Sequence, residues 1–242
     1  MIRLQDLPLN PITSYQLTAV INSALCVGAG GSSGSLADKP IIRTAKNELV
    51  IPASQLKGRL RHECEKLARG LGWSICNSPN PQTMCPQRTG LSEQEKHRFH
   101  RNAYWITANQ QHHCLICQIF GNPVLPSKVL FDDLICTQDP DSVAEVLRPG
   151  VTLNRMRRTA ENQKLFFLET SPANAQLPFV GHIHVPTDFP EWAKALMLAG
   201  LKHIHALGGS KSAGLGWLHW DDCSDWQIDP SAWEFLAQGA AQ

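Results

Sequence analysis

The stretch that decides the fold is residues 54–69, SQLKGRLRHECEKLAR. Its apolar residues recur at spacings of four, four and three: Leu56, Leu60, Cys64 and Leu67. This spacing places them on one face of a helix, which predicts that the helix packs that face against the rest of the fold. Ser54 can cap the first turn of the helix, and Gly70 or Gly72 can end it.

Strand patterns lie on both sides of this helix. Before it, residues 12–27 show a period of two, and short apolar runs at residues 41–42 and 49–52 predict a small hairpin around a polar turn. After it, we expect strands at residues 128–136, 178–186 and 215–221, an extended hairpin from residues 151–157 and 163–170, and a second helix at residues 191–207. The order strand, helix, strands, helix, strand predicts an α+β fold with a ferredoxin-like βαββαβ core.

The composition narrows the class of protein. The chain has 242 residues, of which 43% are hydrophobic, and this is enough to form a core and excludes a wholly disordered chain. Lys and Arg total 22 against 21 Asp and Glu, so the net charge is +1, which excludes a uniformly basic tail but not a local basic groove. Neither a run of about 18 apolar residues nor a signal-peptide pattern is present, so we expect a cytoplasmic protein that contacts no membrane.

Residues 73–113 lack any periodicity and are interpreted as the main part of an insertion beside the core. Four cysteines lie in this region or just after it: Cys76, Cys85, Cys114 and Cys117. The last two have the CxxC spacing of a zinc knuckle, and the first two can supply a second ligand pair, which predicts a structural zinc ion that holds residues 73–117 together. The neighbouring histidines are spare ligands: His97, His100, His112 and His113. A redox-active CxxC is the alternative, but no thioredoxin-like βαβ pattern surrounds it.

A glycine-rich loop, GAGGSSGSLADKP, spans residues 28–40. Its glycines allow the backbone to approach a phosphate closely, although an ordinary surface loop has the same composition. Its last three residues are Asp38, Lys39 and Pro40. A carboxylate at this place can hold a metal ion or accept a proton from an attacking hydroxyl, whereas its alternative role is that of a solvated turn residue.

Three segments concentrate groups that bind phosphate. Near the start of the first helix, Lys57 and Arg61 are four residues apart and share a face, and Arg59 lies beside them. The other two segments contribute Arg155, Arg157 and Arg158 in the extended hairpin, and Gly209, Ser210, Lys211 and Ser212 in the loop after the second helix. This loop lacks the helix-opening GK[ST] order of a nucleotide P-loop, so ATP binding is not expected.

Five segments, in this order, resemble the RAMP superfamily, and more narrowly the backbone subunits of type III CRISPR–Cas effector complexes. They are GAGGSSGSLADKPIIR (28–43), LVIPASQLKGRLR (49–61), CLICQIFGNP (114–123), SKVLFDDL (127–134) and LGGSKSAGLGW (207–217). The resemblance covers about residues 12–220, and one departure is Ala53, where the family pattern has a glycine.

The resemblance implies a single RAMP domain over residues 1–242, with an RRM-like ferredoxin core, a zinc-stabilised insertion at residues 73–117 and a β-hairpin thumb at about residues 148–172. It implies a subunit that grips the backbone of a guide RNA (crRNA) and, as a metal-dependent endoribonuclease, cleaves complementary target RNA at regular intervals. Asp38 falls on the family's cleavage aspartate, for which we expect a divalent cation such as magnesium. Lys57 and Arg61 fall on the guide-binding helix, and the three arginines fall in the thumb. The implied partners are guide RNA, target RNA, other CRISPR effector subunits and head-to-tail copies in a filament.

Two other functions remain open from the sequence. A non-catalytic RNA-binding scaffold would have the same fold and the same partners, with an inert Asp38. A guide-precursor-processing RAMP endoribonuclease would use a histidine as general base, for which His62 or His182 is available, but such enzymes usually contain two ferredoxin units. A zinc-dependent metabolic enzyme is disfavoured, because four cysteines form a closed site without a position for substrate.

Overall fold

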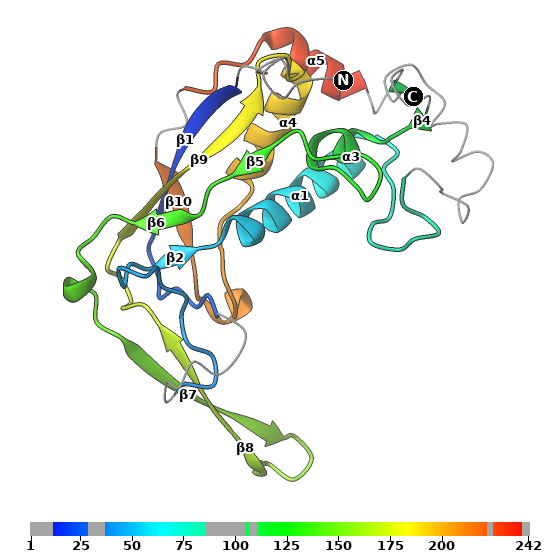
Figure 1. Cartoon of the computed structure of the whole chain (residues 1–242). Helices are drawn as coiled ribbons and strands as arrows, with labels where there is room; N and C mark the ends of the chain where they lie inside the picture. Colours follow the sequence, from blue (N-terminus) through cyan, green and yellow to red (C-terminus); the bar gives the residue numbers. More distant parts are fainter. Residues whose placement is uncertain (1–11, 29–36, 86–104, 107–110, 222–224, 239–242) are drawn as a thin grey trace, which may run out of the picture.

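A computed structural model of the chain describes residues 12–28, 37–85, 105–106, 111–221 and 225–238. They form a central antiparallel sheet, a layer of helices and a long β-hairpin that projects away from the sheet (Figure 1). This confirms the predicted mixed architecture of helices and antiparallel strands. In the part of the chain so described, no helix is both long enough and apolar enough to cross a membrane.

The central sheet has the strand order β10-β1-β9-β6-β2, and β5 also pairs with β9. Its strands are β1 (Ile12–Ile21), β2 (Val50–Ile51), β5 (Leu130–Phe131), β6 (Leu134–Cys136), β9 (Leu177–Pro186) and β10 (Leu218–Asp221). The two longest, β1 and β9, pair along their whole length, from Ile12 opposite Pro186 to Ile21 opposite Leu177. The short strands β3 (Trp105–Ile106) and β4 (Gln111–His112) form a separate two-stranded sheet.

The helices are α1 (Ala53–Gly70), α3 (Leu115–Phe120), α4 (Glu191–Lys202) and α5 (Pro230–Ala237). The helices α1 and α4 pack against each other, and α5 packs on α4. The contact is close at Gly200, because a Cβ there would lie 2.8 Å from the Sγ of Cys64 on α1. Alternate residues of the central strands, such as Leu17 and Phe179, are fully buried and form the core with the helices.

The helix predicted at residues 54–69 is confirmed as α1, but its start is capped in a different way. The N-cap residue is Pro52, and no side chain at that position caps the helix. Instead, the Ala53 backbone N–H donates to Asp133 Oδ1 at 2.7 Å. The expected Ser54 cap is therefore wrong, because the first free N–H group is satisfied by Asp133, which precedes the strand paired with β2.

Asp133 reaches α1 because the strand predicted over residues 128–136 is interrupted between β5 and β6. The carbonyl oxygen of Asp133 lies over Gly181 of β9, where an added Cβ would come within 2.7 Å of it. A side chain at position 181 would therefore collide with this turn. The expectation of one continuous strand was wrong, because Asp132 and Asp133 leave the strand pairing at this point.

The second helix, predicted at residues 191–207, ends at Lys202. Beyond it the chain joins the sheet edge: Ala206 forms an antiparallel bridge with Trp217, and the Leu207 N–H donates to the Gly216 carbonyl at 2.9 Å. Gly208 then turns the chain with a φ of +91°. The sequence expectation was too long because helical periodicity does not register such non-local pairing.

The extended hairpin is confirmed and is longer than expected. Its strands are β7 (Val146–Asn154) and β8 (Thr159–Thr170), and residues 155–158 form the turn. The small hairpin is also present, with Arg43 bridged to Leu49 before β2. Two short 3₁₀ helices, Pro140–Ser142 and Lys211–Ala213, lie before β7 and after α4.

Candidate functional site

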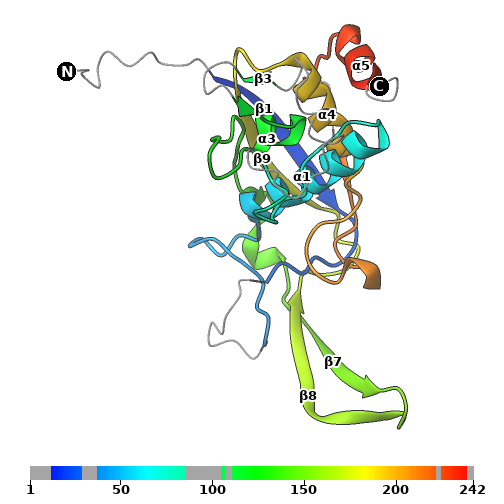
Figure 2. The ribbon, with the colours of Figure 1, turned by 90° about the vertical axis from the view of Figure 1, so that its right-hand side faces the viewer.

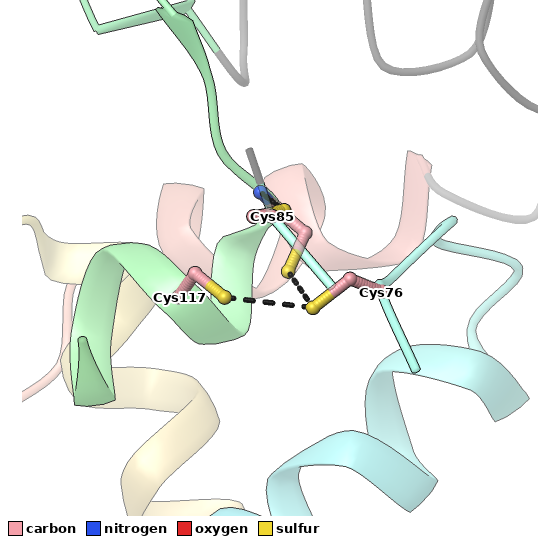
Figure 3. A group of neighbouring side chains, drawn as sticks. Cys76, Cys85 and Cys117 are labelled. Carbon is pink, nitrogen blue, oxygen red and sulfur yellow. Dashed lines mark hydrogen bonds between the residues drawn. The ribbon is translucent and has the colours of Figure 1, made fainter. Parts of the chain in front are cut away.

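Four cysteine side chains converge where the segment after α1 meets the start of α3, and Figure 3 labels three of them, Cys76, Cys85 and Cys117. Cys76 and Cys85 come from that segment, Cys114 is the N-cap residue of α3, and Cys117 lies in its first turn. All four are buried, and their sulfur atoms lie within 4.8 Å of one another. The Sγ of Cys76 is 3.5 Å from that of Cys117 and 3.6 Å from that of Cys114.

These distances suit a tetrahedral metal site. Zinc–sulfur bonds of about 2.3 Å in a tetrahedron place the sulfurs about 3.8 Å apart, whereas a disulfide requires about 2.05 Å. Hydrogen bonds from the other three thiols lower the pKa of Cys76, whereas the pKa values of those three neighbours are raised, so the cluster favours a single thiolate. In the described part of the chain, this is the group of His, Cys, Asp or Glu side chains whose spacing fits an ion. The four predicted ligands are therefore brought together, and they fit zinc.

The spare histidine ligands do not join the cluster in the described part of the chain. His97 and His100 lie outside the described residues, as does the side chain of His112. His113 is buried, and its Nδ1 lies 2.9 Å from the Asn122 side-chain nitrogen. Among the described side chains, the cluster thus consists of four cysteines.

A second feature is a hollow of about 270 Å³ between the first turns of α1 and the loop after α4. It is lined by Ser54, Gln55, Gly58, Arg59 and His62 of α1, and by Ala206, Leu207, Gly208 and Lys211. Gly58 faces open space, since no described atom lies within 4 Å of the position its Cβ would take. Gln55 Oε1 and Arg59 Nε are buried there and have no hydrogen-bond partner among the described residues. The hollow therefore offers two cations and unsatisfied polar atoms to a ligand.

The three cations predicted on α1 point in different directions. Arg59 lines the hollow, and its guanidinium also pairs with the buried Glu63 at 2.8 Å. Arg61 contacts Glu65 at 3.1 Å and donates to the Gly121 carbonyl at 3.1 Å, so it is directed toward the end of α3. Lys57 lies apart from the hollow's lining, and burial together with the nearby Arg61 lowers its pKa. Of the three, the structure brings Arg59 together with Lys211.

The loop after α4 presents its predicted residues to solvent. Gly209 and Ser210 are exposed, as is Ser212. The loop is attached to the segment after β1, because the Gly209 N–H donates to the Cys26 carbonyl at 2.6 Å. Lys211 Nζ donates to the Gly208 carbonyl at 2.9 Å, which keeps the ammonium group beside the hollow.

Asp38 lies at the base of the long hairpin. Its side chain is exposed, and its Oδ2 accepts a hydrogen bond from the Phe167 N–H at 2.7 Å. Its own backbone N–H donates to the Phe167 carbonyl at 3.0 Å. The predicted glycine loop is described only at its two ends, because residues 29–36 lie outside the described residues. The carboxylate is thus exposed and also held to β8.

The tip of the hairpin gathers the three predicted arginines, and all of them are exposed: Arg155, Arg157 and Arg158. Met156 stands among them with 97% of its surface exposed. Asn154 Oδ1 accepts hydrogen bonds from the backbone of the next turn, which fixes its shape. The hairpin carries this basic tip far from the helical layer (Figure 2).

The family model described as the RAMP superfamily matches residues 18–219. The chain belongs to the RAMP superfamily. No curated protein matches the RAMP chain significantly in sequence.

A solved structure, described as the cryo-EM structure of the Type III-B Cmr-beta bound to cognate target RNA, contains a chain with a similar fold. The TM-score is 0.55 at 16% identity, and the match covers 87% of this RAMP chain and 59% of the other. The RAMP chain thus spans about three fifths of that relative's length. At this identity the likeness concerns the fold.

Two residues of this RAMP chain that the sequence reasoning missed stand out at the hairpin base. Glu169 is only 6% exposed although it lies in the strand sequence LFFLET, and Arg43 pairs with it at 3.6 Å. A carboxylate within an apolar strand was the available signal, because a buried charge requires a partner. The partner itself could not be found, since 126 residues separate the two.

Proposed function

We propose that this RAMP chain is a backbone subunit of a type III CRISPR–Cas effector complex that binds guide RNA and cleaves target RNA. The family membership supports this, as does the fold likeness to a chain of an RNA-bound Cmr complex. The strand order β10-β1-β9-β6, with helices after β1 and β9, agrees with a ferredoxin-like, RRM-type core. Other effector subunits and further copies of this chain would be its protein partners.

One observation carries the proposal: an exposed carboxylate, Asp38, is fixed at the base of a hairpin with an arginine-rich tip. In this arrangement the hairpin acts as the thumb, and an RNA strand that lies against it passes Asp38. The basic tip attracts the RNA backbone. The exposed Met156 can pack against a base, because an apolar side chain at a tip has no core to bury it.

Guide RNA would lie along the hollow at the start of α1. Arg59 and Lys211 supply charge, and the exposed Gly209 of the loop after α4 allows a phosphate to approach the backbone closely. Such contacts position a nucleic acid without reading its sequence, which suits a subunit that must accept any guide. Lys57, Arg61 and the exposed Gly209, Ser210 and Ser212 would extend this interface at its edges.

The cleavage step uses a nucleophile that the target RNA contains. The 2′-hydroxyl oxygen attacks the adjacent phosphorus, and the bond from phosphorus to the 5′ oxygen of the next nucleotide breaks. The leaving 5′ oxygen takes up a proton from water, so the products are a 2′,3′-cyclic phosphate and a 5′-hydroxyl. Asp38 would accept the hydroxyl proton, or hold a divalent cation such as magnesium that stabilises the developing charge.

The zinc ion would be structural. Four buried cysteine sulfurs complete a tetrahedral shell, so no position is left for a substrate or a reactive water. The ion would tie the segment after α1 to the start of α3 and so hold the insertion at residues 73–117 against the helical layer.

The proposal is tested by cleavage of a complementary RNA by the assembled complex, with and without magnesium. Asp38→Ala is expected to slow cleavage by about 10²–10⁴-fold, because a general base or charge stabiliser contributes about this much. Guide and target affinity should stay unchanged. Asp141→Ala, another exposed aspartate near the hairpin base, is the matched control and should cleave normally. Normal cleavage by Asp38→Ala would instead support the scaffold function.

A further inference from the structure

The segment that carries Asp38 is attached to the hairpin by a buried carboxylate. Glu169 lies near the end of β8, and its side chain is 7% exposed. Its Oε2 accepts a hydrogen bond from the Ile41 N–H at 3.2 Å, and its Oε1 lies 3.6 Å from an Arg43 guanidinium nitrogen. A buried carboxylate needs such partners, so the contact resists separation.

The backbone continues this attachment toward Asp38. The Glu169 N–H donates to the Lys39 carbonyl at 3.1 Å, and Lys39 forms a parallel bridge with Leu168. Two residues before Glu169, Phe167 bonds to both the backbone and the carboxylate of Asp38. Asp38 and Lys39 therefore run beside β8, and the Glu169 side chain anchors Ile41 and Arg43 farther along the same segment.

We propose that Glu169 is a positioning residue for Asp38, and this proposal rests on the proposed function. Glu169 is too deeply buried to meet the RNA, so it acts through the segment it holds. If the hairpin shifts when RNA binds, residues 38–43 shift with it, and the Asp38 carboxylate keeps its position relative to the hairpin. A misplacement of a reacting group by about 1 Å can cost about 10²-fold in rate.

The test compares Glu169 with Glu145, the other carboxylate that pairs with Arg43. Glu145 contacts Arg43 at 3.3 Å, but its side chain is 63% exposed and holds no backbone group of residues 38–43. In the assembled complex with saturating target, Glu169→Ala should cleave about 10²-fold more slowly. Glu145→Ala should cleave at the wild-type rate, and both variants should bind target as tightly as wild type.

The conservative variant Glu169→Gln keeps an oxygen for the Ile41 N–H and loses only the charge that faces Arg43. We expect it to cleave at an intermediate rate, about tenfold below wild type, with an unchanged melting temperature. If Glu169→Ala does not assemble, the test is the cleavage rate of Glu169→Gln, with Glu145→Gln as its matched control. Equal cleavage by the two Gln variants would overturn the proposal.

Combination with Asp38→Ala separates positioning from general stability. If Glu169 acts through Asp38, then Glu169→Ala should not slow the residual cleavage of Asp38→Ala any further. A further loss would overturn the positioning role. The failure of the proposed function is a different result, because there Asp38→Ala alone would cleave like wild type.

Discussion

The cysteine cluster and the long hairpin lie at different ends of the molecule and are built on opposite principles (Figures 1 and 2). The cluster is buried, and each of its sulfurs faces the other three. The hairpin is exposed along most of its length, with large apolar side chains such as Leu153 and Leu165 about 60% open to solvent. The buried cluster contributes to the stability of the fold, whereas the hairpin exposes a surface to which a partner could bind.

This comparison predicts that substitutions in the two regions fail in different ways. A change in the cluster should affect folding first and RNA second. A change in the hairpin should affect RNA and leave folding intact, because the altered side chains are already in water.

The largest effect is expected from Cys114→Ala, which removes one sulfur of the cluster. Purified wild-type protein should contain about one zinc ion per chain, and the variant much less, by elemental analysis. Because metal binding is coupled to folding, the variant should melt well below wild type, and a strong chelator should reproduce the change. Cys136→Ala is the control: it removes a buried cysteine of β6, outside the cluster, and the variant should keep its zinc. A zinc-free wild type with normal melting would contradict the assignment.

The hairpin tip should respond in the opposite manner. Replacing Arg155, Arg157 and Arg158 together with alanine removes three exposed charges and no described core contact. We expect target RNA to bind at least tenfold more weakly at low salt, since each lost cation removes phosphate contacts. The melting temperature should stay within about 2 °C of wild type, because exposed substitutions usually change stability by less than about 0.5 kcal/mol. A large drop in melting temperature would break the contrast between the two regions.

The hollow at α1 is intermediate between the cluster and the hairpin, because it is formed by a helix of the core and an exposed loop. The double variant Arg59→Ala and Lys211→Ala should weaken guide RNA binding about equally for all sequences. It should also reduce the slope of log affinity against log salt by about 1.4, the value for two phosphate contacts on a single strand. The variant Lys46→Ala, at an exposed lysine of the small hairpin, is the control. An unchanged salt slope would place the guide elsewhere.

The smallest effect concerns the start of α1. Asp133→Ala removes the carboxylate that accepts the Ala53 N–H, and we expect a loss of about 1 kcal/mol, as for other helix caps. For a chain of this size that corresponds to a fall of about 2–4 °C in melting temperature. Ser54→Ala should have no comparable effect, because its side chain makes no capping bond. Equal effects of the two substitutions would contradict the observed cap.

Much of the fold could be predicted because its signals are local. The spacing of Leu56, Leu60 and Cys64 predicted α1, and the strand and hairpin patterns predicted most of the sheet. The CxxC spacing of Cys114 and Cys117 pointed to a metal site before any distance was known. Helix α5 also has local signals that were overlooked, since Asp229 caps it and Pro230 begins it.

The directions of side chains and the end of one helix depend on contacts between distant parts of the chain, which local patterns do not contain. The tertiary structure turned Arg61 toward Glu65 and Gly121 and brought Arg59 beside Lys211, because the direction of a helix face depends on what packs on it. It ended α4 at Lys202, because the next residues gain hydrogen bonds at the sheet edge.

The same distinction applies to the candidate site. From the sequence alone, Asp38 was a carboxylate at the end of a glycine-rich loop, and nothing nearby in the chain indicated how it is held. Its partner Phe167 lies about 130 residues away, and so does Glu169, which anchors the neighbouring Ile41. Local sequence was enough to predict which chemical groups are present and where most helices and strands form, since these depend mainly on neighbouring residues. Only the folded chain decided which groups meet, because hydrogen bonds and buried ion pairs join residues that are distant in sequence.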